Sequence, residues 1–332
     1  MVLDGHGTAI VMRQYGGPEV LRLETVALAS LQSDEIRIRS IASPVNHSDL
    51  EIRAGNWPIL KPDPFPYTPG LEVVGEVVEV GANVSDVRVG ERVISMMQGL
   101  GGVRAQRPGS YAEFVVVHAS AVAAFAADID PIDMAALGLA SVTAFEALRR
   151  IGDLNNRRIA VTGAAGGVGS AAVAIAKAQG AQVIGIISGS DQAEYVCSLG
   201  ASTTINSQDV AAGALGSETV DGVLDTVAGK WFGAYVTALR PAGVLSLVGA
   251  VGGSDVSFDA YRLLEVTLTG YASDTLDGAA LRRVISSISE WVSRGIIRAP
   301  VRSVFPLQEA AAAHAKLEQH LVQGRVLLVA RD

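Results

Sequence analysis

The chain has 332 residues, of which 49% are hydrophobic and 18% charged, and this balance excludes an intrinsically disordered or coiled-coil protein. Its 26 Lys and Arg against 34 Asp and Glu give a net charge of −8 and lack the clustered positive charge that nucleic acid requires. Cys197 is the only cysteine, so an intrachain disulfide is excluded and a reducing, cytoplasmic location is expected.

Neither a signal peptide nor a membrane span is expected. Residues 1–15 lack a charged region followed by an apolar one. Residues 159–176 carry no charge and approach the length of a membrane span, but four glycines lie between residues 163 and 169. A buried strand, a tight turn and a buried helix explain that composition better than a helix in lipid.

Residues 1–125 are predicted to be rich in strands. Ile36 and Ile38 alternate with arginines, which is the two-residue period of a half-buried strand. Residues 73–80 and 113–117 are predicted as two further strands because they are rich in valine. Between the first two strands, five prolines at 58–69 exclude regular structure.

After Pro131 a helix over 132–150 is expected, and then strands and helices alternate. The strands are expected at 158–162, 182–187, 203–205, 222–225, 244–248 and around Leu268, with helices at 168–179, 192–199 and 231–239. Strict alternation of this kind predicts a parallel sheet with right-handed crossovers.

The last part of the chain is expected to hold a helix over 277–294, a strand at 301–305, a helix at 307–320 and a strand at 326–329. It has too few elements for a core of its own, so we expect it to return to the first domain. The parallel-sheet domain, residues 127–272, is then an insertion between residues 1–126 and 273–332.

The segment TGAAGGVG at 162–169 follows a predicted strand and opens a predicted helix, which is the context of a dinucleotide-binding fingerprint. Gly166 would let the backbone approach a pyrophosphate, Gly169 would let the helix pack on the strand, and the helix N-terminus favours an anion. A purely structural tight turn is the alternative. The expected cofactor contacts here are Ala164, Gly166, Gly167, Val168 and Gly169.

The end of the second strand of this domain, at 187–188, decides between NAD and NADP. An acidic residue there would bind the ribose 2′-hydroxyl of NAD, but neither residue is acidic. Ser188, Ser190 and the helix start at Gln192 offer polar groups to a 2′-phosphate, although Asp191 opposes it and no cation is adjacent. On balance NADP(H) is favoured over NAD(H).

Several further short sequence motifs, taken together, resemble those of one protein family. VNHSD at 45–49, PYTPG at 66–70, GSYAE at 109–113 and the glycine loop follow one another as in the medium-chain dehydrogenase/reductase superfamily, and in particular its zinc-independent, ζ-crystallin-like quinone oxidoreductase branch. The resemblance covers essentially the whole chain. It implies an α/β protein in which a GroES-like, β-rich catalytic domain is interrupted by a Rossmann domain with a doubly wound parallel sheet that binds NADP(H).

The zinc-binding members of that family have the string Gly-His-Glu where this chain has Gly70-Leu71-Glu72. Leu71 cannot coordinate a metal, and Cys197 lies in a helix of the expected nucleotide domain, so no metal site is expected. Reduction of an isolated carbonyl normally needs a Lewis acid. Conjugate reduction of an enone or quinone spreads the charge through an enolate and is therefore favoured.

The resemblance also implies candidate catalytic residues. Asn46 matches a family asparagine near the nicotinamide and ribose, and Thr143 a threonine beside the nicotinamide; a turn residue and an ordinary helix threonine are the alternatives. Trp57 stands where relatives carry a tyrosine, and its indole donates a hydrogen bond without supplying a proton. It would stack against a ring or cover a domain edge. Gly249 and Ala250 would line the nicotinamide pocket or form a turn.

Other polar residues have simpler interpretations. His47, Ser48 and Asp49 are adjacent on a stretch expected to be extended, so they cannot converge as a triad, and Asp49 is expected to order the loop. His314 and His320 are expected to be solvated on a helix with polar ends.

The leading hypothesis is therefore a metal-free, NADPH-dependent reductase that transfers hydride to a quinone or an α,β-unsaturated carbonyl compound. By family analogy it is a homodimer, since 244–248 resembles the sheet element near the edge that pairs subunits; a buried central strand is the alternative explanation of its apolar residues. An enoyl-thioester (enoyl-CoA) reductase is the alternative enzyme, disfavoured by Trp57 and by the lack of a basic patch. A nucleotide-binding redox sensor or structural protein with little turnover is the alternative of another class.

Overall fold

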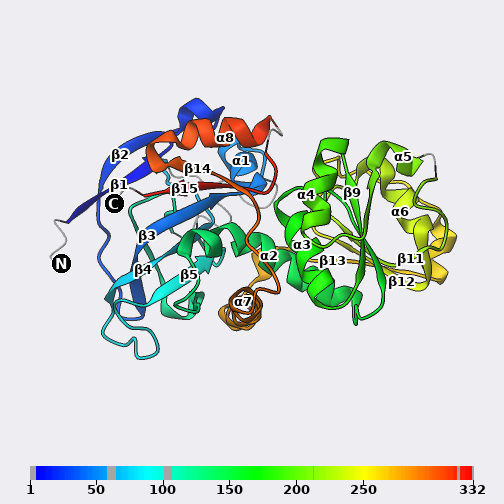
Figure 1. The fold of residues 1–332 in the computed structure, drawn as a ribbon. Coiled ribbons are helices and arrows are strands. Elements are labelled where there is room, and N and C mark those ends of the chain that lie inside the picture. The colour runs from blue at the N-terminus through cyan, green and yellow to red at the C-terminus, as the bar shows by residue number, and fades with distance from the viewer. Residues whose placement is uncertain (1–4, 58–64, 101–106, 212, 320–321, 331–332) are drawn as a thin grey trace. The chain divides into compact units, whose positions relative to one another are not determined.

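The computed structural model describes residues 5–57, 65–100, 107–211, 213–319 and 322–330 (Figure 1). The chain divides into two compact units. Unit 1 comprises Met1–Leu139, Asp274–Ser293 and Val301–Asp332, and unit 2 comprises Ala140–Ser273 and Arg294–Pro300. The first part of the proline-rich segment, residues 58–64, and His320 lie outside the described residues.

Unit 2 is built on a six-stranded parallel sheet with the strand order β10-β9-β8-β11-β12-β13. Its strands are β8 (Arg158–Val161), β9 (Gln182–Ile187), β10 (Thr203–Asn206), β11 (Val220–Asp225), β12 (Leu239–Leu247) and β13 (Thr267–Gly270). Its helices are α3 (Gly167–Ala178), α4 (Ala193–Ser198), α5 (Ser207–Ala211) and α6 (Phe232–Ala238). This is the doubly wound Rossmann order, and the prediction of a parallel α/β domain is confirmed.

The order of the strands reverses between β8 and β11, so the topological switch point lies at the carboxyl ends of these two strands. The two strands are central and carry apolar residues on both faces, as buried parallel strands do. Ile159, Val161, Val223 and Leu224 are all fully buried. The two buried strands therefore fix the position of the loop that follows β8.

Unit 1 contains a seven-stranded sheet with the order β14-β15-β3-β4-β5-β7, in which β6 also pairs with β3, and a separate antiparallel pair of β1 and β2. The strands are β1 (His6–Val11), β2 (Arg22–Ala27), β3 (Glu35–Val45), β4 (Glu72–Val80), β5 (Arg92–Met96), β6 (Phe114–His118), β7 (Val122–Ala124), β14 (Arg302–Pro306) and β15 (Arg325–Val329). The helices are α1 (His47–Ala54), α7 (Gly278–Ser293) and α8 (Ala310–Glu318). The two last strands of the chain therefore complete a sheet begun near its start.

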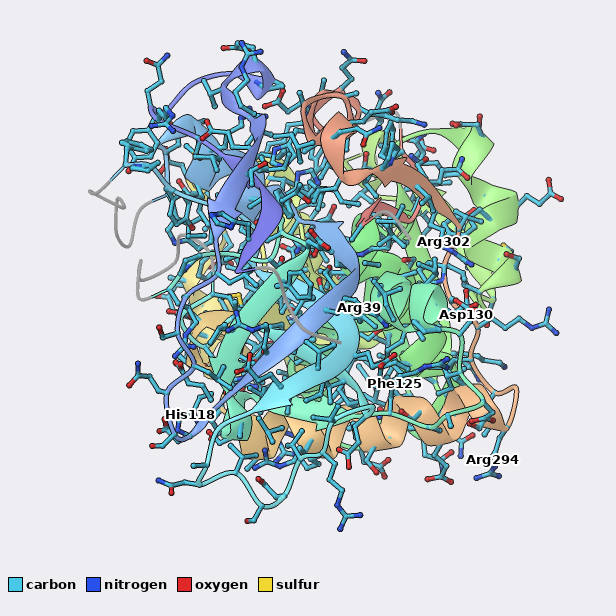
Figure 2. All side chains as sticks on the ribbon, turned by 90° about the vertical axis from the view of Figure 1, so that its left-hand side faces the viewer. Arg39, His118, Phe125, Asp130, Arg294 and Arg302 are labelled. Atoms are coloured by element: carbon cyan, nitrogen blue, oxygen red, sulfur yellow. The ribbon has the colours of Figure 1, made fainter. Side chains whose placement is uncertain are left out.

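Alternation of side chains accounts for part of this sheet. Ile36 and Ile38 of β3 are fully buried and Arg39 is exposed on the surface (Figure 2). The intervening Arg37 is 5% exposed and pairs with Glu79 at 2.8 Å, so the predicted half-buried period does not hold at that position. On α7, Leu281, Val284 and Ile288 are spaced by three and four residues and are fully buried, so one stripe of that helix faces the core.

Helix α2 (Pro131–Ile151) runs across the boundary between the two units, and its Gly138 is not helical, with φ 22° and ψ −133°. Among the described residues it is the one helix that is long and apolar enough to span a membrane, and 78% of that apolar window is buried inside the structure. The charge-free segment at 159–176, in contrast, forms β8, a turn and α3, as predicted.

Short 3-10 helices lie at Pro18–Val20, Ala119–Ala121, Ser190–Gln192, Gly229–Trp231, Ala260–Leu264, Ser273–Thr275 and Leu307–Glu309. Two expectations need correction. The strand expected at 244–248 runs instead from Leu239 to Leu247, as β12, and it lies near the edge of the sheet, between β11 and the edge strand β13. The stretch holding His47 and Asp49 is not extended but forms the first turn of α1.

Candidate functional site

The loop between β8 and α3 is shaped by two glycines. Gly163 has a left-handed φ of +55°, and a Cβ there would lie 2.5 Å from Oγ1 of Thr226. A Cβ on Gly169 would lie 2.1 Å from the carbonyl oxygen of Gly163, so only glycine lets the first turn of α3 approach its own loop. The tight turn therefore depends on Gly163, one position before the Ala164 that takes the first place of the fingerprint.

The five residues predicted for this loop differ in access. Gly166 is exposed, and Gly167 and Val168 are half-buried at the N-terminus of α3. The first N–H groups of a helix have no intrahelical acceptor, so this end suits the diphosphate of a dinucleotide. Ala164 is fully buried and its N–H donates to the carbonyl of Ile186 at 3.0 Å, so it contributes packing and not a free donor.

A buried carboxylate at the end of β11 was missed by the sequence analysis. Oδ1 of Asp225 accepts hydrogen bonds from Oγ1 of Thr162 at 2.6 Å and from the N–H groups of Val227 and Ala228 at 3.0 and 3.1 Å. Thr162 in turn accepts from the N–H of Thr226 at 2.8 Å. Burial raises the pKa of Asp225, and the hydrogen bond from Thr162 opposes that shift. The signal in the sequence was an acid directly after the apolar residues Val223 and Leu224, at the end of the strand.

The loop after β12 lies against the loop after β11. The N–H of Val248 donates to the carbonyl of Asp225 at 2.8 Å, and a Cβ on Gly249 would lie 2.8 Å from the carbonyl oxygen of Thr226. Ala250 is exposed, and its carbonyl accepts from the N–H of Gly253 at 2.9 Å, which makes a turn. Thr226 thus contacts both the glycine loop and the Gly249 loop.

The predicted phosphate-recognition residues lie at the end of β9. The N–H and the hydroxyl of Ser188 donate to Oε1 of Gln192 at 3.1 and 3.3 Å, so these two residues are brought together. Ser188, Ser190 and Asp191 are exposed. The loop therefore presents the hydroxyl groups of Ser188 and Ser190 to solvent, beside the carboxylate of Asp191.

Of the other predicted residues, Thr143 is buried on the part of α2 that belongs to unit 2. Trp57 belongs to unit 1 and follows the end of α1, where Gly55 adopts a left-handed φ of 79°. The Trp57 ring is half-buried, and its buried indole nitrogen makes no hydrogen bond to any residue that the structure describes.

Asn46, which precedes α1, is held by two buried charged residues. Nη1 of Arg325 donates to Oδ1 of Asn46 at 3.0 Å, and Nη2 of Arg325 donates to Oε2 of Glu72 at 3.1 Å. Nδ2 of Asn46 lies 3.4 Å from the same carboxylate oxygen. Glu72 is fully buried and Arg325 is 5% exposed, whereas Asn46 is half-buried and accessible. Glu72 and Arg325 were not among the predicted site residues.

The other carboxylate oxygen of Glu72, Oε1, contacts α2 at its kink. Oε1 accepts from the N–H of Leu139 at 2.5 Å, and a Cβ on Gly138 would lie 1.6 Å from the same oxygen. Only glycine therefore leaves room for the carboxylate at this point of the helix. Burial raises the pKa of Glu72, and the Arg325 guanidinium acts in the opposite direction.

The expectation that His314 is solvated is wrong, because this side chain on α8 is fully buried. Nη1 of Arg53 lies 3.3 Å from Nδ1, and a guanidinium only donates, so Nδ1 accepts and the ring hydrogen resides on Nε2. Nε2 then donates to the hydroxyl of Tyr111 at 3.1 Å. Burial, helped by Arg53, lowers the pKa of His314 to about 3.

Asp49 orders the start of α1, as predicted. The N–H of Asn46 donates to Oδ2 of Asp49 at 2.8 Å, and the N–H of Asp49 donates back to the carbonyl of Asn46 at 3.0 Å. This reciprocal pair fixes the backbone of Asn46. Burial raises the pKa of Asp49 to about 7.

The string that matches the family's zinc-binding position has no metal-binding arrangement around it. Leu71 is fully buried hydrocarbon, and both oxygens of Glu72 accept hydrogen bonds from the chain. Across the described ranges, no three or more His, Cys, Asp or Glu side chains form a group that could hold a metal ion.

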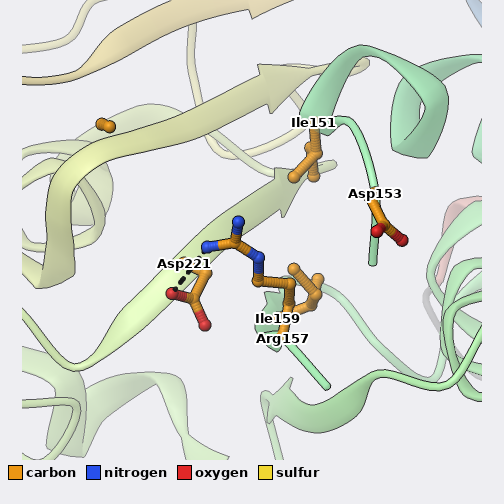
Figure 3. Close-up of a pocket in the computed structure, with 6 residues that line it drawn as sticks. Ile151, Asp153, Arg157, Ile159 and Asp221 are labelled. Atoms are coloured by element: carbon orange, nitrogen blue, oxygen red, sulfur yellow. Dashed lines mark hydrogen bonds and ion pairs between the residues drawn. The ribbon is translucent and has the colours of Figure 1, made fainter. Parts of the chain in front are cut away.

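A small cavity lies at the other end of the unit 2 sheet, where β8 and β11 begin (Figure 3). Its volume is about 80 Å³, and Arg157 pairs there with Asp221 at 3.5 Å. A dinucleotide needs a cleft of roughly 300 Å³ or more at the carboxyl ends of the strands. This cavity is therefore not a cofactor site.

The comparisons with known proteins agree with this geometry. Residues 32–127 match the alcohol dehydrogenase GroES-like domain, and residues 167–290 match the domain described as zinc-binding dehydrogenase. A 2-haloacrylate reductase from a Burkholderia species is 30% identical over 338 residues, covering 97% of this chain and 98% of the relative. Quinone oxidoreductase from Rattus norvegicus is 28% identical over 92% of both chains.

Among solved structures, the Escherichia coli quinone oxidoreductase complexed with NADPH superposes with a TM-score of 0.84 at 26% identity and covers 97% of this chain and 99% of that one. The structure of AibC gives a TM-score of 0.87 at 26% identity, covering 99% and 97%. The chain belongs to the medium-chain dehydrogenase/reductase superfamily, in its quinone oxidoreductase branch. It is an oxidoreductase with a fold that binds a pyridine nucleotide.

Proposed function

We propose that this chain is an NADPH-dependent, zinc-independent reductase that transfers hydride to a quinone or to an α,β-unsaturated carbonyl compound. The observation that carries the proposal is the buried Glu72–Arg325 pair beside Leu71. At the position where zinc-binding relatives have ligands, this chain has a hydrocarbon and a carboxylate already engaged by its own donors. Acceptors that spread charge through an enolate do not need a Lewis acid and suit this site.

The glycine loop would hold the cofactor. The backbone N–H groups of Gly167 and Val168 at the start of α3 would bind the diphosphate, and Gly166, whose own N–H donates to the Gly163 carbonyl at 2.9 Å, would leave space for it. The Gly249 loop would lie along the nicotinamide end. A reduced nicotinamide supplies hydride when it is bound. The chain's own contribution is to orient the acceptor through Asn46 and Thr143, with Trp57 as a flat apolar wall.

The preference for NADPH is supported by the loop after β9. Ser188 and Ser190 are exposed, and neither residue 187 nor residue 188 is acidic. A similar quinone oxidoreductase was solved as a complex with NADPH, which supports the same choice here. Asp191 and the lack of an adjacent Lys or Arg in this loop act against it.

Oxidation of NADPH and of NADH, followed by absorbance with 1,4-quinones, enones, crotonyl-CoA and a simple ketone, tests the proposal. We expect turnover with NADPH and quinones or enones, no turnover with the ketone and no effect of a chelator. Turnover with crotonyl-CoA alone would favour the enoyl-thioester reductase. Cofactor binding without reduction of any acceptor would favour the redox sensor, and loss of activity on chelation would contradict zinc independence.

We also propose that the protein is a cytoplasmic homodimer that binds neither nucleic acid nor membranes. The edge strand β13 has a hydrogen-bonded neighbour on one side only among the described strands. The 3-10 helix just before it exposes Tyr261, Leu263 and Leu264 at 78, 51 and 82%. An open strand edge beside apolar side chains suits an isologous contact with a second copy.

A further inference from the structure

We propose that Arg325 is a positioning residue that sets the direction of the Asn46 carboxamide, so that Asn46 offers an N–H, and not its oxygen, to the molecule bound beside it. This inference rests on the proposed function. It assigns a role to a residue that does not itself reach the substrate.

The direction of the carboxamide follows from what its neighbours can do. A guanidinium has only donors, so the Asn46 atom 3.0 Å from Nη1 of Arg325 must be the oxygen. An ionised carboxylate only accepts, so the Asn46 atom 3.4 Å from Oε2 of Glu72 must be the nitrogen. A flipped carboxamide would place donor against donor and acceptor against acceptor. Both contacts therefore select one orientation.

The orienting pair is rigid because its two residues begin the strands β15 and β4, which flank β3 in one sheet. Arg325 begins β15, Asn46 follows the end of β3, and Glu72 begins β4. Both β15 and β4 pair with β3 in antiparallel fashion, so these three positions share one end of the sheet. The Leu139 N–H bond to Glu72 and the reciprocal backbone bonds between Asn46 and Asp49 fix the remaining freedom.

Only Asn46 of this trio is open to a ligand. Glu72 is fully buried and Arg325 is 5% exposed, with both of its Nη atoms engaged. Nδ2 of Asn46 carries a second hydrogen that the contact with Glu72 does not use. A substrate oxygen that gains negative charge during reduction is stabilised by such a donor, whereas the amide oxygen would repel it.

A double-mutant cycle tests this inference with Arg325→Gln, Asn46→Ala and the double variant. We expect each single change to lower kcat by about 100-fold, with KM for NADPH changed less than about twofold, because a donor is lost or misdirected. Since Arg325 acts through Asn46, the double variant should be no slower than Asn46→Ala alone. If the fold-losses in kcat of the two single variants multiplied in the double variant, the inference would be overturned. Arg325→Lys should be intermediate, because an ammonium keeps the charge but not the two-pronged geometry.

Arg302 supplies a matched control, because it is the direct cross-strand partner of Arg325 in β14 and lies exposed on the surface (Figure 2). Its own ion pair is with Asp133 at 2.6 Å. Arg302→Gln should leave kcat within about twofold, since exposed ion pairs contribute little. An equal loss in Arg302→Gln and Arg325→Gln would contradict a specific role for Arg325.

A second readout needs no turnover. The chain has six asparagines, so selective 15N labelling gives few side-chain amide signals, and the pair missing in Asn46→Ala belongs to Asn46. Arg325→Gln should change the chemical shifts of the Asn46 side-chain amide pair, and Arg302→Gln should not. If Arg325→Gln does not fold, Arg325→Lys takes its place. Unmoved signals would overturn the inference, whereas wild-type protein that oxidises no cofactor with any acceptor would contradict the proposed function alone.

Discussion

Gly169 shows how a single missing side chain shapes the candidate cofactor site. A Cβ at this position would lie 2.1 Å from the Gly163 carbonyl oxygen, whereas a Cβ on Gly166 would come no closer than 3.3 Å to the same atom. The fingerprint glycines thus serve two purposes. Gly169 is required by packing, and Gly166 leaves space for a ligand.

Gly169→Ala is expected to lower the free energy of unfolding by about 1–3 kcal/mol, because the loop and α3 must separate to admit the methyl group. Gly166→Ala should change it by less than about 0.5 kcal/mol but weaken NADPH binding by filling the space left for the diphosphate. Denaturant unfolding and fluorescence titration of both variants measure these effects. Equal stability of the two variants would be inconsistent with the geometry.

Ser188→Asp is expected to reverse the cofactor preference. A carboxylate at the end of β9 repels a 2′-phosphate and binds a ribose 2′-hydroxyl, so KM for NADPH should rise about tenfold or more while KM for NADH falls or stays. Steady-state kinetics with both cofactors measure this, with Ser217→Asp, at an exposed serine outside this loop, as the control. A change of equal size for both cofactors would rule out recognition of the phosphate by this loop.

At the scale of elements, buried polar contacts fasten helices of unit 1 to their neighbours. His314 of α8 lies between Arg53 of α1 and Tyr111, which precedes β6. Arg53 also pairs with Glu318 near the end of α8. Because the imidazole accepts from a permanent cation, it must stay neutral in the folded protein.

This contact predicts an acid-sensitive stability. The pKa of His314 is about 3 in the folded state against an ordinary value of 6.5, so its contribution is fully present above pH 6.5 and is lost as the pH falls toward 3. The unfolding free energy of wild type relative to His314→Gln should fall by about 1 kcal/mol per pH unit in that window. Urea unfolding of both proteins between pH 4 and 7.5 measures it. A constant difference would show that the histidine does not remain neutral.

The kink of α2 is a second element-scale feature, and it depends on Gly138. Gly138→Ala should cost about 3 kcal/mol or more of stability, because a Cβ would lie 1.6 Å from Oε1 of buried Glu72. Gly152, just after the same helix, has a φ of +104° and no atom within 4 Å of a Cβ, so Gly152→Ala should cost only about 1 kcal/mol. Thermal unfolding compares the two. Similar losses would mean that backbone conformation, and not the carboxylate, makes Gly138 necessary.

At the scale of the whole molecule, exposed apolar residues recur in the segment between β12 and β13, the edge strand of the unit 2 sheet. Tyr261, Leu263 and Leu264 precede β13, and Val251 and Val256 follow β12; all five are exposed. A monomer would leave these side chains in water, together with the edge of β13 that pairs with no other strand in the described part of the chain. A second copy would cover both.

Leu264→Arg is therefore expected to convert a dimer into a monomer, because it places a charge in the middle of the apolar contact. Val304→Arg is the control, since Val304 is also exposed, at 49%, but lies on β14 of unit 1. Light scattering after size-exclusion chromatography measures the mass of each. A monomeric wild type, or a dimer that survives Leu264→Arg, would contradict the proposed interface.

Structural features that depend on residues close together in the chain could be predicted from the sequence. Apolar alternation around Ile36 and the succession of strands and helices after Pro131 led to the right fold class, and the TGAAGGVG segment indicated the loop at the switch point. These features depend on local spacing, which the chain displays directly. Leu71 likewise needed no structure, because a leucine cannot bind a metal wherever it lies.

Contacts between residues far apart in the chain were decided only by tertiary structure. Arg325 reaches Asn46 and Glu72 across separations of 279 and 253 residues, and His314 reaches Arg53 across 261. A lone arginine or histidine on a polar stretch has the same local pattern whether it is solvated or buried. Its role depends on which strand or helix packs beside it, and that follows from burial of the whole sheet, since a buried charge is stable only where the fold supplies its partner.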